Sequence, residues 1–139
     1  MILKKVNKNN VHLINSFLDN AQDAINTFTY YNKRNMSVVE NHLVTYIGFF
    51  ENQAVSYGHL DLEKKKIWLG VAVSSNYQKL GFGRSMMNKL ILFAKRKKIN
   101  KIHLSVSKSN LIALSLYKKF GFEICKESDN NFECVLTLK

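Results

Sequence analysis

The chain has 139 residues, 46% of them hydrophobic, which predicts one domain with an ordinary buried core. The formal net charge of +11 comes mostly from scattered lysines without a nucleic-acid-binding motif, so we place nucleic-acid binding last among the functions considered. We find no apolar run that could span a membrane and no signal peptide, and we therefore expect no membrane partner and a cytoplasmic protein.

The N-terminal part of the chain predicts a strand, a helix and an aromatic loop. Residues 1–6 alternate as a strand does, and residues 10–21 repeat apolar side chains at helical spacing. Residues 27–37 combine aromatic and basic side chains and are expected to form a loop followed by a short helix. Residues 43–50 and 54–62 then predict a hairpin, before a lysine-rich turn and a further strand over residues 66–73.

Polar side chains share one face of the strand over residues 54–62. Tyr57, His59 and Asp61 alternate with glycine and leucine, so all three project to the same side. An unperturbed histidine titrates near neutrality, which suits a general base. A solvated sheet face, or a histidine satisfied by its neighbours, explains the pattern equally well.

The loop after the strand at residues 66–73 is the most informative stretch. Gln78-Lys79-Leu80-Gly81-Phe82-Gly83 leads into a helix predicted over residues 82–97. Its glycines let the backbone approach a ligand, and the unpaired first amides of the helix suit a pyrophosphate. The stretch lacks the third glycine and later acidic residue of a Rossmann site, and the Gly-Lys-Ser/Thr of a P-loop. We therefore expect a phosphate-bearing ligand that is neither a nicotinamide dinucleotide nor a nucleoside triphosphate with magnesium.

The remaining elements alternate between strand and helix, which indicates an α/β or α+β fold with a mixed sheet. They are a strand at 101–107, a helix at 110–120 and a closing hairpin of residues 122–127 and 132–138.

Asn110 and Tyr117 are candidate site residues on the second of these helices. They are seven residues apart and so share a face, although a core tyrosine with a wet hydroxyl has the same spacing. Ser109 is expected to cap the helix, and Gly121 to end it in a left-handed turn.

Cys125 and Cys134 show no metal-binding spacing, and we expect no metal site. If residues 128–131 form the turn of the last hairpin, the two cysteines lie on adjacent strands, equally far from its centre. A cross-strand disulfide is geometrically conceivable. Because cytosolic thiols stay reduced, we expect two buried free thiols instead.

Together the loop and the later helix resemble the GNAT superfamily of acetyl-CoA-dependent N-acetyltransferases. The family loop, Gln/Arg-x-x-Gly-x-Gly/Ala, is matched by Gln78, Gly81 and Gly83. The family's later motif, Asn-x-x-Ala-x-x-x-Tyr-x-Lys-x-Gly-Phe, is matched by Asn110, Ala113, Tyr117, Lys119, Gly121 and Phe122. The resemblance is clear over residues 43–122. One departure is Ser75, where many members carry proline, and we expect it to loosen the turn before the loop.

The resemblance implies an α/β (α+β) fold in a single N-acetyltransferase domain over residues 1–139. The expected sheet is mixed, mostly antiparallel and of about six or seven strands, flanked by about four helices. Two central strands, ending here at Val73 and Ser107, are expected to splay apart and admit acetyl-CoA as a co-substrate.

The resemblance also implies how the cofactor is bound. Backbone groups on the first splayed strand would pair with the pantetheine arm, loop amides would hold the pyrophosphate, and Asn110 would bond the pantetheine or the acetyl end. The expected cofactor-binding residues are Val71, Ala72, Val73, Gln78, Lys79, Leu80, Gly81, Phe82, Gly83, Arg84, Asn110 and Tyr117.

The implied reaction is direct attack of an amine on the thioester, with a backbone amide near Val73 stabilising the oxyanion and Tyr117 as the general acid for the leaving thiolate. Many family members carry a glutamate that can act as the general base early on the strand before the loop, near the positions of Lys65 and Lys66, and this chain has no carboxylate there. His59 is our first candidate base, Asp61 the second and a water relay the third, with His103 a weaker outsider.

The family places its variable acceptor-facing loop at residues 28–34. The expected substrate-binding residues are Tyr30, Tyr31, Arg34, Tyr57 and His59, since aromatic rings stack on sugars or bases and cations pair with phosphate. We therefore expect a small-molecule amine acceptor, such as a nucleotide-linked amino sugar. A loop that merely packs on the sheet has the same composition.

Two alternative functions remain. The first is a protein or peptide N-acetyltransferase acting on an N-terminal or lysine amine, and the more distant one is a non-catalytic acyl-CoA or nucleic-acid-binding module. The sequence leaves the oligomeric state open, a homodimer included.

Overall fold

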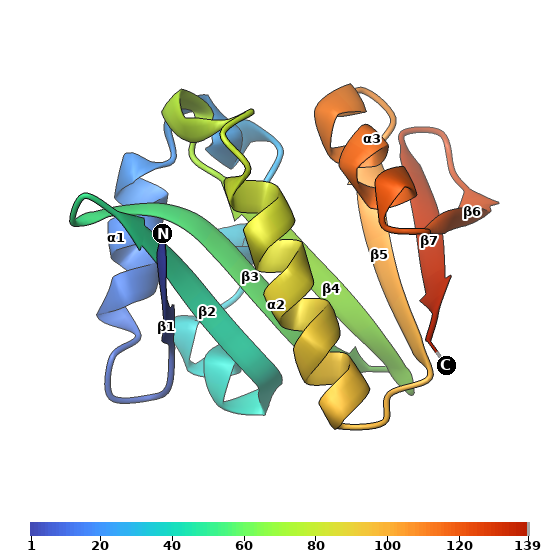
Figure 1. Cartoon of the computed structure of the whole chain (residues 1–139), viewed down its shortest axis with the longest axis horizontal. Helices are drawn as coiled ribbons and strands as arrows, with labels where there is room; N and C mark the ends of the chain where they lie inside the picture. Colours follow the sequence, from blue (N-terminus) through green and yellow to red (C-terminus); the bar gives the residue numbers. More distant parts are fainter. Residues whose placement is uncertain (139) are drawn as a thin grey trace.

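The computed structural model describes residues 1–138. Seven strands form one sheet in the order β1-β2-β3-β4-β5-β7-β6 (Figure 1). Neighbouring strands are antiparallel except β4 and β5, which are parallel. The strands are β1 (Ile2–Lys5), β2 (His42–Phe50), β3 (Gln53–Glu63), β4 (Lys66–Val73), β5 (Lys101–Ser107), β6 (Glu123–Glu127) and β7 (Asn131–Thr137).

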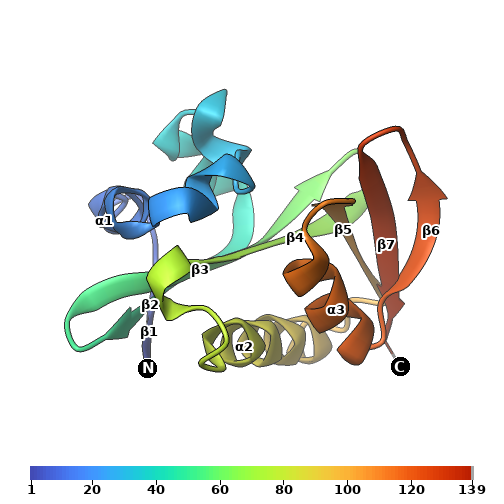
Figure 2. The same ribbon diagram turned by 90° about the horizontal axis from the view of Figure 1, so that it is seen from above.

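Helices cover both faces of this sheet. The described residues form three α-helices, α1 (His12–Asn20), α2 (Phe82–Arg96) and α3 (Leu111–Lys119). Four short 3-10 segments accompany them: η1 (Gln22–Asn26), η2 (Tyr30–Asn32), η3 (Met36–Asn41) and η4 (Ser75–Tyr77). Figure 2 shows α2 and α3 on one face, and α1 with η1 to η3 on the other. The fold class predicted from the sequence is confirmed.

Two hydrophobic clusters form the core, one on each side of the sheet. On the α2 side, Met86, Met87, Leu90 and Ala94 are fully buried, because their spacing places them on one face of the helix. On the α1 side, Ile14 and Phe17 pack with Ile47 and Tyr57 in a second cluster. The sheet is therefore held rigidly between two apolar layers.

Tight turns set the register of the first strands. Glu51 and Asn52 have φ values of 50° and 65°, and Lys64 and Lys65 have φ values of 51° and 67°. Two left-handed residues in succession are typical of a two-residue hairpin turn whose twist matches that of the strands. Gln53, expected in the turn, pairs with Phe50 instead, so the first turn is one residue shorter than predicted.

The parallel strands β4 and β5 diverge. Among the residues that the structure describes, Trp68 and His103 are their single registered pair, whereas β3 and β4 pair from one end to the other. Beyond Trp68 the two strands separate toward Val73 and Ser107, and Figure 1 shows the gap opening between them. The splay expected from the resemblance is therefore present, between the strands predicted to form it.

Hydrogen bonds fix the turn that follows β4. The amide of Ser75, which proline would lack, donates to the carbonyl of Ala21 at 3.1 Å, and the hydroxyl of Ser74 donates to the carbonyl of Asn20 at 2.6 Å. The expectation of a loosened turn is therefore wrong, because serine ties this segment to the end of α1.

The ends of α3 correct one detail and confirm another. Asn110, not Ser109, caps the helix, since its side-chain oxygen accepts from the amide of Ala113 at 3.2 Å. Gly121 is left-handed (φ 98°), as predicted. The amide of Gly121 bonds the carbonyl of Lys118, and the amide of Phe122 bonds that of Tyr117, which completes a Schellman motif.

The two cysteines are free, but they do not lie as expected. Cys134 is buried, whereas Cys125 is exposed. A β-bulge between Ile124 and Lys126 leaves Cys125 without a cross-strand partner, and Cys134 pairs with Ile124. The expectation of two buried thiols is therefore wrong for Cys125, because the extra residue changes the register of the hairpin.

No helix among the described residues combines the length and the apolar character needed to cross a membrane.

Candidate active site

The start of α2 leaves its first backbone amides without partners inside the helix. Gly81 is the N-cap residue in the left-handed conformation (φ 88°), and no side chain of the described residues caps the helix. The amide of Ser85 bonds the carbonyl of Gly81 at 3.0 Å, so the amides of Phe82, Gly83 and Arg84 precede the first helical hydrogen bond. The first turn carries no acidic residue. The positive end of the helix dipole can therefore receive a phosphate group.

The loop before this helix is shaped for close approach. Lys79 adopts a left-handed conformation (φ 64°), which is strained for a residue with a side chain. The side-chain amide of Gln78 donates to the carbonyl of Val73 at 3.4 Å and joins the loop to the end of β4. A Cβ atom added to Gly81 would meet no atom within 4 Å. The loop therefore borders open space.

Tyr117 lies in α3, on the α2 side of the sheet. Its side chain is 6% exposed and packs in one cluster with Leu104, Val106 and Phe122. Burial, together with the charge of Cys134, raises the pKa of Tyr117 to about 12. The phenol therefore keeps its proton throughout the physiological range and can act only as a proton donor.

The opposite face of the sheet carries the polar side chains of β3. Tyr57, His59 and Asp61 are 0%, 2% and 7% exposed, so the expectation of a solvated face is wrong. The segment around η2 lies over this face of the sheet (Figure 2). The hydroxyls of Tyr30 and Tyr31 hydrogen-bond with Asp61 and Tyr57. The loop at residues 28–34 therefore packs on the sheet, which is the alternative that its composition also allowed.

His59 is joined to a chain of hydroxyls. Its Nδ1 atom lies 2.6 Å from the hydroxyl of Tyr57, which lies 2.6 Å from the hydroxyl of Tyr31. The imidazole also lies against β4, because a Cβ atom added to Gly70 would be 2.6 Å from its Cε1 atom and 2.8 Å from its Nε2 atom. Only glycine at this position leaves room for the ring.

A second polar chain contains His42, which the sequence analysis did not single out. The hydroxyl of Tyr30 donates to Asp61 at 3.1 Å and lies 2.7 Å from Nε2 of His42. Because this hydroxyl uses its proton on Asp61, neutral His42 must carry its proton on Nε2. Its Nδ1 atom then accepts from the hydroxyl of Thr45 at 2.7 Å. The register that pairs His42 with Asp61 brings these side chains together.

Burial dominates the titration of these groups. It lowers the pKa of His42 from 6.5 to about 4, with a contribution from Arg34. Burial also holds the pKa of His59 well below its ordinary value, assisted by His42 and Arg34. The pKa of Asp61 is raised by burial, although its hydrogen bond with Tyr30 opposes the shift. Both histidines are therefore neutral near pH 7.

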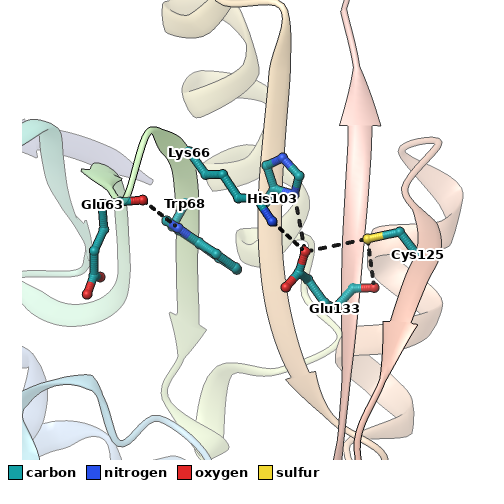
Figure 3. Close-up of polar contacts among 6 residues, drawn as sticks. All are labelled: Glu63, Lys66, Trp68, His103, Cys125 and Glu133. Carbon is teal, nitrogen blue, oxygen red and sulfur yellow. Dashed lines mark hydrogen bonds and ion pairs between the residues drawn. The ribbon is translucent and has the colours of Figure 1, made fainter.

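Farther along the same face, Lys66 and Glu133 form an ion pair at 3.4 Å (Figure 3). Burial alone would raise the pKa of Glu133, but the hydrogen bond and charge of Lys66, together with the charge of Lys126, lower it. The strand that begins at Lys66 carries no carboxylate of its own. The structure places a carboxylate beside Lys66 from β7, a strand distant in sequence.

The predicted catalytic residues therefore lie on opposite faces of the sheet. Tyr117 packs beneath β5 with α2 and α3, and His59 lies over β4 on the side of α1. β4 and β5 lie between the two residues and separate beyond the Trp68–His103 pair. The side chains of Tyr117 and His59 are themselves 6% and 2% exposed, so both are buried.

Comparison with known proteins relates these features to a family. Residues 11–122 match the Acetyltransferase (GNAT) family. The spermine/spermidine N(1)-acetyltransferase of Bacillus subtilis (strain 168) is 35% identical over 78 residues, which are 55% of this chain and 51% of that protein. A probable spermine N(1)-acetyltransferase of Bacillus subtilis subsp. natto has the same identity and coverage. The chain spans about half the length of these curated relatives.

Solved structures share the whole fold at low sequence identity. The ribosomal-protein-alanine N-acetyltransferase of Brucella melitensis superposes with a TM-score of 0.79 at 17% identity, covering 99% of this chain and 100% of that one. The PaiA N-acetyltransferase of Thermoplasma acidophilum, solved in complex with coenzyme A, superposes with a TM-score of 0.77 at 15% identity. It covers 99% of this chain and 100% of its own.

Proposed function

This chain belongs to the GNAT acetyltransferase family, and from that premise we propose that it transfers the acetyl group of acetyl-CoA to the primary amine of a small molecule. The observation that supports this most is the splay of β4 from β5 directly before the uncapped start of α2. The two features together provide a slot for a thioester arm and a phosphate site at its end.

The cofactor-binding residues belong to two segments in this proposal. Backbone groups of Val71, Ala72 and Val73 face the gap and pair with the pantetheine arm as an added strand would. The backbone amides of residues 79–84, which are Lys79, Leu80, Gly81, Phe82, Gly83 and Arg84, hold the pyrophosphate. Gln78, which precedes them, assists. Asn110 uses its oxygen for the helix cap, which leaves its NH₂ group to donate to the pantetheine.

The reaction forms one C–N bond and breaks one C–S bond. The amine nitrogen attacks the thioester carbonyl, and a backbone amide near Val73 stabilises the oxyanion. As the intermediate collapses, Tyr117 gives its proton to the leaving thiolate. The attacking nitrogen, which becomes positively charged as the C–N bond forms, loses one proton to a base on the α1 side, where His59 lies over Gly70. Proton exchange with solvent then restores Tyr117 and the base.

His59 serves as this base in one tautomer. For Nε2 to accept a proton, Nδ1–H must donate to the hydroxyl of Tyr57, which in turn donates to Tyr31. The depressed pKa of His59 keeps it neutral but makes it a weak base. Asp61, whose pKa is raised by burial, is the second candidate. Loss of activity in His59→Gln that higher pH restores supports His59, and unchanged activity removes it.

The charges of the acceptor face support an amine with an anionic tail, such as a nucleotide-linked amino sugar. Arg34 lies 4.1 Å from the ring centre of Tyr30, and Lys66 lies farther along the same face. The carboxylates of Asp61 and Glu133 are already engaged by Tyr30 and Lys66. A polyamine is the second candidate, because two relatives are named for spermine.

Release of free thiol from acetyl-CoA tests the proposal. The assay compares three kinds of acceptor: nucleotide-linked amino sugars, spermidine, and a peptide with an N-terminal alanine. An amine that is already acetylated is the blank. Thiol release that depends on a small amine supports the proposal. Thiol release with the peptide alone assigns the chain to protein acetylation. If acetyl-CoA binds but none of the amines gives thiol release, catalysis is contradicted.

A further inference from the structure

Three strands bring a histidine, a cysteine and a glutamate together on the acceptor face. His103 comes from β5, Cys125 from β6 and Glu133 from β7 (Figure 3). The Nδ1, Sγ and carboxylate atoms of these residues all lie within 4.8 Å of one another. We refer to the three residues as the His103 cluster.

The bulge in β6 creates this arrangement. In an unbroken hairpin a cysteine at position 125 would oppose Cys134, but the register shift between Ile124 and Lys126 leaves it unpaired. Its Sγ atom lies 3.6 Å from Oε2 of Glu133 and 3.4 Å from the Glu133 carbonyl oxygen. The spacing between the two cysteines therefore could not reveal this cluster. Cys125 is 22 residues after His103 and 8 residues before Glu133.

One atom of the cluster lacks a hydrogen-bond partner. Nδ1 of His103 is the one fully buried side-chain nitrogen or oxygen in residues 1–138 without such a bond. It faces Oε2 of Glu133 at 3.5 Å, which is long for a hydrogen bond. A buried polar atom without a partner is costly, and a metal ion would satisfy it.

We propose that the His103 cluster binds a divalent transition metal ion of the zinc type through His103 Nδ1, Cys125 Sγ and Glu133 Oε2. Nitrogen, sulfur and oxygen together suit this borderline-soft class. Tetrahedral coordination at ordinary zinc bond lengths separates nitrogen from oxygen by about 3.4 Å and sulfur from oxygen by about 3.6 Å. The observed separations of 3.5 Å and 3.6 Å are close to these values. The fourth position is open to water.

Nearby lysines oppose a cation at this site. Lys66 Nζ lies 3.4 Å from Oε2 of Glu133, and Lys126 follows Cys125 in β6. The side chain of Lys66 is 36% exposed on a flexible stem, so it can move into solvent when a metal ion takes its place. Removing the charge of Lys66 is therefore expected to strengthen metal binding, although none of the three proposed ligands is changed.

Titration with Co²⁺ under reducing conditions tests the proposal independently of acetyl transfer. A Co²⁺ ion bound to a thiolate gives a ligand-to-metal charge-transfer band in the near ultraviolet. The wild-type chain is expected to develop this band with one equivalent of Co²⁺, and Zn²⁺ is expected to abolish it. Cys125→Ser is expected to remove the band, and Lys66→Gln to produce it at lower Co²⁺ concentration.

Cys134→Ser is the matched control, because Cys134 lies in the same hairpin on the opposite, buried face. It is expected to keep the band. His103→Gln is expected to weaken binding by about tenfold or more. The absence of the band in the wild-type chain overturns the proposal. Its persistence in Cys125→Ser, or its loss in Cys134→Ser alone, does so as well.

Discussion

Tyr117 and His42 show how burial decides what a single residue can do. The sequence placed Tyr117 on a helix face but could not separate a catalytic hydroxyl from a core residue. In the structure the ring belongs to the core cluster that also contains Leu69 of β4 and Val106 of β5. His42 gave no signal, because its partners Tyr30, Thr45 and Asp61 meet only through the strand register and the fold of the loop.

Tyr117→Phe is expected to lower kcat by about tenfold to a hundredfold and to leave the affinity for coenzyme A nearly unchanged. The effect is limited because a thiolate is already a fair leaving group. Steady-state kinetics with free-thiol detection measures it. Tyr46→Phe, a change at a tyrosine that is also buried (7% exposed) but lies in β2, is the control and keeps wild-type kcat. Equal kcat for Tyr117→Phe and the wild type would remove the acid role.

The free energy of unfolding is expected to fall as the pH drops from about 7 to about 5. The pKa of His42 is about 4 in the fold against 6.5 ordinarily, so in this window the unfolded chain binds more protons than the folded one. Its contribution is therefore present above pH 6.5 and is lost as the pH falls toward 4. His59 acts in the same direction, and the raised pKa of Asp61 opposes both.

Urea unfolding at the two pH values measures this loss. His42→Gln is expected to reduce the pH dependence, since one of the two depressed groups is gone. The exposed His12 on α1 provides the control, and His12→Gln should retain the wild-type slope. A slope that His42→Gln leaves unchanged would contradict the assignment.

Signals that are local in the sequence predicted the bounds of single helices and strands well, but they did not predict contacts between distant segments. Helical spacing and the glycine-bearing loop located α2 to within one residue at its end, and β5 agrees residue for residue. The bulge in β6 was missed, because an extra residue in one strand leaves no mark on the alternation of such a short exposed segment. Glu133 was missed as a neighbour of Lys66 for a similar reason, since β7 meets β5 only through the sheet order.

Gly81→Ala tests the loop before α2. The left-handed conformation at Gly81 (φ 88°) costs a residue with a side chain about 1–2 kcal/mol, so stability should fall by that amount. Affinity for coenzyme A should fall in addition, because the amides that follow lose their position. Gly121→Ala carries the same strain (φ 98°) just after the C-terminal end of α3 and is the matched control.

Chemical unfolding and calorimetry separate the two effects of these glycine substitutions. Both variants are expected to lose similar stability, but only Gly81→Ala should bind coenzyme A more weakly than the wild type. If both variants bind it equally well, the loop does not hold the pyrophosphate.

Across the molecule as a whole, the proposed function depends on one departure from regular strand pairing. A continuous sheet would bury the edges of β4 and β5 against each other and leave no backbone groups free to pair with the cofactor. The sequence predicted this splay only through the family resemblance, because strand composition gives no sign of which neighbours separate. The acceptor was the least predictable feature, since it depends on loop side chains that are packed on the sheet.

Hydrogen exchange with and without acetyl-CoA tests the central claim most directly, because it locates the ligand on the backbone. Binding is expected to slow exchange in peptides that cover residues 69–73 of β4 and residues 79–85 of the loop and first turn of α2, and to leave β1 and β2 unchanged. Binding that protects neither segment, or protects only segments away from the gap between β4 and β5, would contradict the account.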